Sequence, residues 1–114
     1  MKLKEPLLFR QQAYIDGAWC DADSGATFAV DNPATGEIIG QVPDMGAAET
    51  QRAIDAANAA LPAWSKMSAK ARAAILRKWF DLIIANADDL AQLMVLEQGK
   101  PFAEAKGEVA YGAS

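Results

Sequence analysis

Apolar and polar residues follow two different spacings in this chain, and the change falls near residue 46. Before it, short apolar runs are separated by turn residues, which is typical of strands joined by tight turns. After it, apolar residues return every three or four positions, as on one face of an α-helix. The pattern predicts a strand-rich region over residues 1–43 and a helical region over residues 46–114, and hence an α+β segment.

Two β-hairpins are expected in the first region. Asp16-Gly17 separates two short apolar runs. An Asp-Gly pair favours a type I′ turn, because that turn needs positive φ at both central residues. A second hairpin is expected between strands over residues 27–30 and 37–43. Asn32-Pro33 ends the first of these strands, since proline cannot donate a hydrogen bond to a ladder.

The helical region divides into about four helices. The first begins after Gly46 and is expected to end or kink before Pro62, because the residue before a proline is biased away from helical backbone angles. Ser68 is placed to cap the second helix, since its hydroxyl can accept a hydrogen bond from a free N–H of the first turn. The residues expected on the buried face of the second helix are Arg72, Ile75, Leu76, Trp79, Phe80 and Ile83.

A third and a fourth helix follow. Asp88 or Asp89 can cap the third helix, and Gly99 fits the left-handed position that often ends a helix. Pro101 fits the first position of the fourth helix, where its missing N–H is not needed. No stop signal precedes the end of the segment, so this helix is expected to be truncated. The residues expected on its inner face are Phe102, Ala105, Val109, Gly112 and Ala113.

Composition narrows the classes of protein that the chain can represent. Apolar residues make up 52% of its 114 residues, which excludes a disordered chain. The net charge of −4 argues against a nucleic-acid partner, because that affinity comes mainly from basic residues that neutralise phosphates. No apolar run is long enough to span a membrane. A single cysteine, Cys20, offers no disulfide within the chain, and the expected location is cytoplasmic.

Two short segments carry a family resemblance. They are residues 32–37 (Asn-Pro-Ala-Thr-Gly-Glu) and 96–101 (Leu-Glu-Gln-Gly-Lys-Pro), about sixty residues apart. In this order they resemble the N-terminal region of the aldehyde dehydrogenase superfamily. The segments 8–13, 60–64 and 104–109 most resemble bacterial succinate-semialdehyde dehydrogenases.

The resemblance implies a fold and an activity for a longer parent enzyme. The parent is expected to have an α/β cofactor-binding domain, of which residues 1–114 are the N-terminal part, and to form a dimer or tetramer. Family members oxidise aldehydes to acids with NAD or NADP. A cysteine attacks the aldehyde, hydride passes to the nicotinamide, and water activated by a glutamate hydrolyses the thioester.

No segment of this chain matches the family's nucleophile, base or cofactor-loop motifs. We therefore assign no catalytic residue and no cofactor-binding residue, and we expect the segment alone to bind no cofactor and to be inactive. Cys20 matches no nucleophile motif, and the chain has no histidine to activate its thiol. A partly buried, unreactive cysteine is the expectation.

One ligand site is implied in part by the same resemblance. Several family members hold a monovalent cation with backbone carbonyls just before Asn-Pro and with a carboxylate before Gly-Lys-Pro. These positions correspond to Val30, Asp31 and Glu97. Carbonyl and carboxylate oxygens suit a hard cation. The alternative is that Glu97 is a solvent-facing residue at a helix end.

Two functions from different classes stay open at this point. The first is the N-terminal piece of an NAD(P)-dependent aldehyde dehydrogenase that acts on succinate semialdehyde, with the remainder of the parent chain as its partner. The second is a free-standing interaction module without enzymatic activity. The fourth helix favours the first function, because a complete module should cap its last helix and cover its apolar face.

Overall fold

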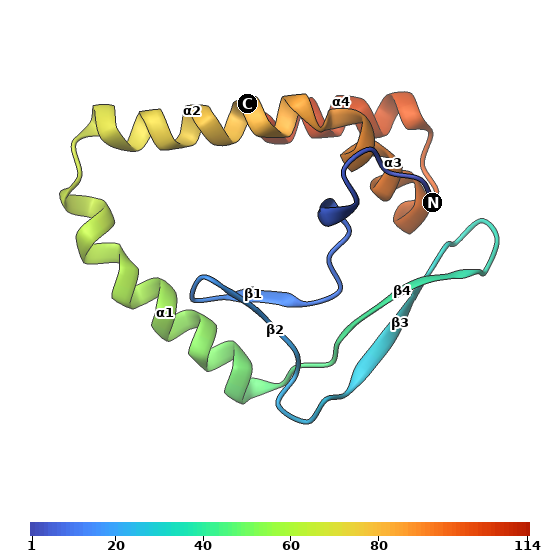
Figure 1. Ribbon diagram of the computed structural model, residues 1–114, viewed down its shortest axis with the longest axis horizontal. Coiled ribbons are helices and arrows are strands. Elements are labelled where there is room, and N and C mark those ends of the chain that lie inside the picture. Colours follow the sequence, from blue (N-terminus) through green and yellow to red (C-terminus); the bar gives the residue numbers. More distant parts are fainter.

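The computed structural model describes residues 1–114, and it confirms the two expected hairpins (Figure 1). β1 (Ala13–Ile15) pairs with β2 (Ala18–Cys20), and β3 (Thr27–Asp31) pairs with β4 (Ile38–Pro43), both antiparallel. The turn at Asp16-Gly17 has φ angles of 51° and 79°, the positive values that a type I′ turn requires. Each sheet has only two strands, so neither is expected to be stable without cover from other elements.

Four helices follow the hairpins, which confirms the α+β prediction. They are α1 (Ala47–Lys66), α2 (Ala69–Ala85), α3 (Ala87–Gln98) and α4 (Phe102–Ala113). A short 3₁₀ turn, η1 (Pro6–Leu8), precedes the hairpins and was not predicted from the sequence. None of the helices combines the length and the apolar character needed to cross a membrane.

Two helix ends lie where the local sequence predicts them. The Ser68 hydroxyl oxygen accepts a hydrogen bond from the Ala71 N–H at 3.1 Å, so Ser68 caps α2. Gly99 ends α3 with φ 71° and ψ 16°, and its N–H donates to the Val95 carbonyl oxygen at 2.8 Å. Both ends are decided by chemistry within a single helical turn.

Two other helix boundaries differ from the predictions. The expectation was that α1 ends or kinks before Pro62, and the first alternative is wrong, because α1 continues through Pro62 to Lys66. The hydrogen bonds of the adjoining turns hold the helix across the one bond that proline removes. Pro101 is the residue before α4 rather than its first helical residue.

The prediction that Asp88 or Asp89 caps α3 is wrong, since Asn86 precedes its first residue. The Asp89 carboxylate instead accepts the N–H groups of Lys4 and Glu5, at 3.1 and 2.8 Å. Asp89 is 5% exposed, and it fixes the start of the chain to the first turn of α3.

A second buried carboxylate makes a similar connection at α1. Glu49 is 6% exposed, and its two oxygens accept the N–H groups of Asp23 and Gly46, each at 3.0 Å. Arg52 on the same helix forms a bidentate ion pair with the Asp23 carboxylate. The turn that follows β2 is therefore fixed to the first turns of α1.

The arrangement of these elements is open (Figure 1). α1 and α2 form two sides of an arch, and α4 runs alongside α2. The radius of gyration is 16.6 Å, whereas a compact domain of this length has about 13 Å. Six of the 114 residues are buried. The single apolar cluster is the contact of α3 with α4, made by Ala91, Ala105 and Val109.

Two predicted buried faces are only partly buried within this chain. On α4, Ala105 and Val109 are buried as expected, but Phe102 keeps 46% of its surface exposed. On α2, Ile75, Leu76 and Trp79 are each exposed by half or more. No element of the chain packs over these side chains. The periodicity of the sequence therefore predicted an apolar helix face but not what packs against it.

Hairpin β3–β4 approaches the helices at the end of α3. A Cβ atom added to Gly99 would lie 3.1 Å from the Cγ atom of Pro33. This distance is shorter than an ordinary van der Waals contact, so a methyl group at residue 99 would push the pyrrolidine ring away by a few tenths of an ångström. Gly99 is thus favoured both by its positive φ and by this contact.

Gly99→Ala should lower the free energy of unfolding by about 1 kcal/mol or more, because alanine is strained at positive φ and its methyl group displaces Pro33. Gly107→Ala is the matched control. Gly107 lies inside α4 with no atom within 4 Å of an added Cβ, and alanine there should stabilise by about 0.5–1 kcal/mol. Urea unfolding of each variant and of the wild type measures both changes in the free energy of unfolding. Shifts of the same sign would contradict the role given to Gly99.

Glu49→Gln tests the carboxylate that fixes α1. The hydrogen bonds from the backbone, first of all that from Asp23, hold the pKa of Glu49 below its ordinary value. A lowered folded pKa gives stability that is complete above about pH 4.3, the unfolded value, and is lost as pH falls through the folded value. The urea midpoint of the wild type should therefore fall more steeply between about pH 5 and pH 3 than that of the variant. Parallel pH profiles would show that the carboxylate makes no such contribution.

Candidate cation site

The segment 32–37 forms a closed turn between β3 and β4. The Asn32 carbonyl oxygen accepts the Gly36 N–H at 2.7 Å, and the Asn32 N–H donates to the Glu37 carbonyl oxygen at 2.8 Å. The Asn32 side-chain oxygen accepts the Ala34 N–H at 2.9 Å. These bonds use the polar groups of asparagine within the turn itself. The turn holds Pro33 in a fixed position.

The segment 96–101 connects α3 to α4. Gly99 reverses the chain, and Lys100 forms an ion pair with Glu108 on α4. Because Pro33 lies against Gly99, the two segments that carry the family resemblance are neighbours in space. Each segment taken alone is ordinary turn chemistry, and only the fold brings them together.

A small cavity of about 20 Å³ lies between hairpin β3–β4, residues 9–11 and the end of α3. Val30 and Glu97 both line it, with Phe9, Gln11 and Gly40 among the other lining residues. A volume of this size holds about one water-sized particle. The strand register shifts between Val30 and Asp31, and an irregularity of this kind leaves part of the ladder unpaired. The volume of the cavity therefore matches that of one small ion.

The structure brings together two of the three predicted cation ligands. Val30 and Glu97 line the cavity, whereas Asp31 does not. Asp31 pairs with Ile38 in the ladder and is exposed. The set of three ligands stays a prediction.

Sequence reasoning missed the contribution of the first residues to this cavity. An added Cβ on Gly40 would lie 2.7 Å from Phe9 and 3.0 Å from the Gln11 side-chain oxygen. The same Gln11 oxygen accepts the Gln41 N–H at 2.8 Å. A glycine inside a strand can mark the close approach of another segment, so Gly40 was the available signal.

The charge of Glu97 is not neutralised by a neighbouring base. Glu97 is exposed and takes part in none of the four ion pairs of the chain. Arg10 lines the same cavity, but its guanidinium carbon lies 4.6 Å from the centre of the Trp19 ring. No three His, Cys, Asp or Glu side chains are gathered as a divalent or transition metal would require. An exposed carboxylate at the end of α3 also matches the alternative, a solvent-facing residue at a helix end.

Cys20 ends β2 and is half-buried, as expected. Its thiol donates to the Ala13 carbonyl oxygen of the paired strand, at 3.5 Å. The chain has no histidine, so nothing near this thiol resembles a nucleophile and its base. The contact stabilises the first hairpin.

Comparison with known proteins agrees with the resemblance. Residues 19–114 match the model of the aldehyde dehydrogenase family. The chain is 70% identical to a glutarate-semialdehyde dehydrogenase of Pseudomonas aeruginosa and 61% identical to the NADP⁺ succinate-semialdehyde dehydrogenase of Escherichia coli, in each case over 100% of this chain and 24% of the relative.

A solved structure of succinate-semialdehyde dehydrogenase from Burkholderia pseudomallei superposes with a TM-score of 0.97 at 64% identity, over 100% of this chain and 24% of that one. The 114 residues thus span about a quarter of the length of the relatives that they match. This chain belongs to the aldehyde dehydrogenase family.

Proposed function

We propose that a polypeptide of the relatives' full length, carrying these residues, oxidises the semialdehyde of a short dicarboxylic acid to the diacid, with NADP or NAD as the hydride acceptor. Succinate semialdehyde is the first candidate substrate. The observation that carries the proposal is sequence identity of 61–70% over the whole of this chain with enzymes named for such semialdehydes. Glutarate semialdehyde is the second candidate, because the relative that shares 70% identity is named for it.

The proposed reaction uses a cysteine that lies outside these residues. The cysteine sulfur bonds to the aldehyde carbon, and hydride leaves that carbon for the nicotinamide. Water then cleaves the thioester, which releases the acid and regenerates the thiol. The only thiol within residues 1–114 is that of Cys20, and it donates a hydrogen bond to the Ala13 carbonyl oxygen. We assign the segment the role of a scaffold that supports the catalytic residues elsewhere.

The substrate proposal is tested by steady-state kinetics on the full-length protein with succinate semialdehyde, glutarate semialdehyde and butanal. A site built for a carboxylate should favour the two semialdehydes over butanal by at least about 100-fold in kcat/KM. Cys20→Ser should leave kcat unchanged, and residues 1–114 alone should reduce no cofactor. Equal use of butanal would overturn the substrate class. An absence of cofactor reduction with all three aldehydes would overturn the activity and favour a non-enzymatic interaction module.

The cavity beside Glu97 is proposed to hold sodium or potassium with a structural effect. An ion bound only by the folded state stabilises it by mass action. Replacing the alkali cation with a bulky organic cation at constant ionic strength should lower the melting temperature of the full-length protein. Glu97→Gln should remove most of this dependence. Glu104→Gln, a change at another exposed carboxylate of the helical region, should preserve it. Identical melting of the wild type in both salts would refute the site.

A further inference from the structure

Residues 4–12 form a segment that crosses three elements of the fold without entering a core, and we call it the N-terminal strap. It begins beside α3, passes β4 and continues into β1 (Figure 1). None of its residues is buried, and Leu7 in its middle keeps 65% of its surface exposed. Segments with few buried contacts open at a lower free-energy cost than packed helices. A small number of specific contacts must therefore hold the strap in place.

The first contact is made by Asp89 at the start of the strap. This carboxylate is 5% exposed in the first turn of α3, and its two oxygens accept the N–H groups of Lys4 and Glu5 at 3.1 and 2.8 Å. Hydrogen bonds to an ionised carboxylate are stronger than those between neutral groups. They are also reversible, because the carboxylate and both N–H groups can bond to water when the strap leaves. Asp89 can therefore hold the strap without preventing its release.

The second contact lies at β4, near the other end of the strap. An added Cβ atom on Gly40 would lie 2.7 Å from the Cζ atom of Phe9, so the ring lies directly on the backbone of β4. The Gln11 side-chain oxygen accepts the Gln41 N–H at 2.8 Å. Residues 9–11 also line the cavity of about 20 Å³. The strap therefore forms one wall of that cavity, and its removal would open the cavity to solvent.

The turn η1 connects the two contacts and keeps its shape through hydrogen bonds of its own. The Leu8 N–H donates to the Glu5 carbonyl oxygen at 3.1 Å, and the Phe9 N–H donates to the Pro6 carbonyl oxygen at 3.2 Å. The Glu5 carboxylate also accepts an N–H of the same turn. Because these bonds lie within the strap, they persist when it leaves the surface. The two contacts are thus joined by a stiff segment, so the loss of either contact weakens the other.

We propose that the strap opens as one unit while the helices stay folded, that Asp89 holds it closed, and that its opening exposes the cavity beside Glu97. Because the strap is a wall of this cavity, its position decides whether a particle inside can exchange with solvent. The inference goes beyond the proposed oxidation of a semialdehyde and does not require it. It also stands without an ion in the cavity, since every contact that closes the strap is made by protein atoms.

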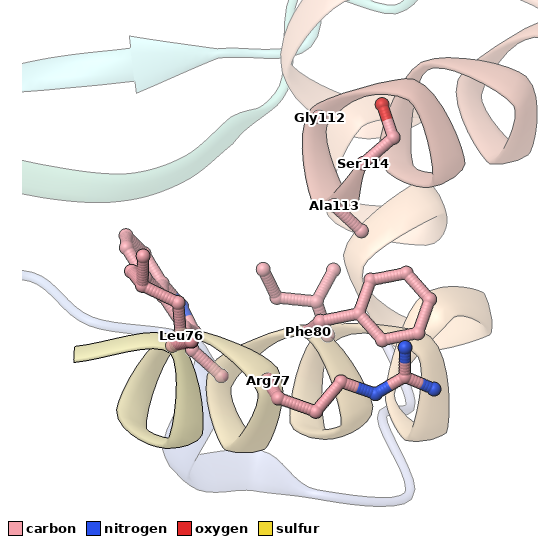
Figure 2. A pocket seen from close by; sticks show the side chains of 9 residues that line it. Leu76, Arg77, Phe80, Gly112, Ala113 and Ser114 are labelled. Carbon is pink, nitrogen blue, oxygen red and sulfur yellow. The ribbon is translucent and has the colours of Figure 1, made fainter. Parts of the chain in front are cut away.

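Limited proteolysis of the full-length protein with trypsin tests the strap. Trypsin cleaves after arginine, and the Arg10 guanidinium lies 4.6 Å from the centre of the Trp19 ring of β2, so the protease reaches the Arg10–Gln11 bond only after the strap leaves. Arg77 reports on the helices, because it lies inside α2 with its guanidinium 4.7 Å from the centre of the Phe80 ring (Figure 2). Mass spectrometry of the released peptides gives both cleavage rates.

Asp89→Asn should speed cleavage after Arg10 by about tenfold or more and leave cleavage after Arg77 unchanged. An amide has one acceptor oxygen, so one N–H of the strap loses its partner, and proteolysis follows the population of the open state. Asp88→Asn is the matched control, since Asp88 is the exposed neighbour that bonds to Lys106 rather than to the strap. It removes the same charge from the same turn of α3 and should change the Arg10 rate by less than about twofold.

Gly40→Ala is a second variant, which leaves Asp89 intact and displaces Phe9 from β4. It should also speed cleavage after Arg10, because the same strap is released from its other end. Hydrogen exchange of the two N–H groups bound by Asp89 should then accelerate as well, since the strap opens as one unit.

Four outcomes would overturn the proposal. Cleavage after Arg10 at the wild-type rate in Asp89→Asn, or an equal acceleration by Asp88→Asn, would remove the role given to Asp89. A parallel rise in cleavage after Arg77 would show global unfolding instead of strap opening. Unchanged hydrogen exchange in Gly40→Ala would show that the two ends open separately. None of these readouts needs turnover or an alkali cation, so the strap and the proposed function can fail independently.

Discussion

Two buried carboxylates hold the front of this chain to its helices. Glu49 and Asp89 are the only buried charged residues, and each lies in the first turn of a helix, where the helix dipole favours negative charge. Each accepts two backbone N–H groups, and most of these belong to segments distant in sequence. An unpaired N–H at such a site is costly. These bonds therefore fix the N-terminal segment to α3 and the turn after β2 to α1.

The hydrogen bonds of Glu49 and Asp89 matter because residues 1–114 bury little apolar surface among themselves. The contact of α3 with α4 is its one apolar cluster, whereas α1 and α2 extend as an arch with their large side chains exposed. Helices gain most of their stability from tertiary packing of an apolar face. Most of the large apolar side chains of α1 and α2 thus have no tertiary cover within these residues. The relatives that the chain matches are about four times longer.

The candidate cation site also depends on contacts between segments that lie far apart in the sequence. A turn closed by Asn32 presents Pro33, and the absence of a side chain at Gly99 lets the ring approach the end of α3. That contact places Glu97 near the bulged part of β3, beside a cavity of the size of one small ion. A cation there would connect the hairpin to the helices with no bond to a substrate. Its proposed effect is accordingly on stability rather than on chemistry.

The sequence by itself determined the features that are settled within a few residues. The Asp16-Gly17 turn, the Ser68 cap and the left-handed Gly99 were all predictable, because backbone angles and caps depend on adjacent atoms. Tertiary structure alone decided that Asp89 accepts the backbone N–H groups of Lys4 and Glu5, that Phe9 lies against Gly40, and that Val30 and Glu97 line one cavity. Each depends on segments far apart in the chain, and local propensity carries no information about which of them meet. The exposed face of α2 shows the same limit, since periodicity identifies an apolar surface but not what covers it.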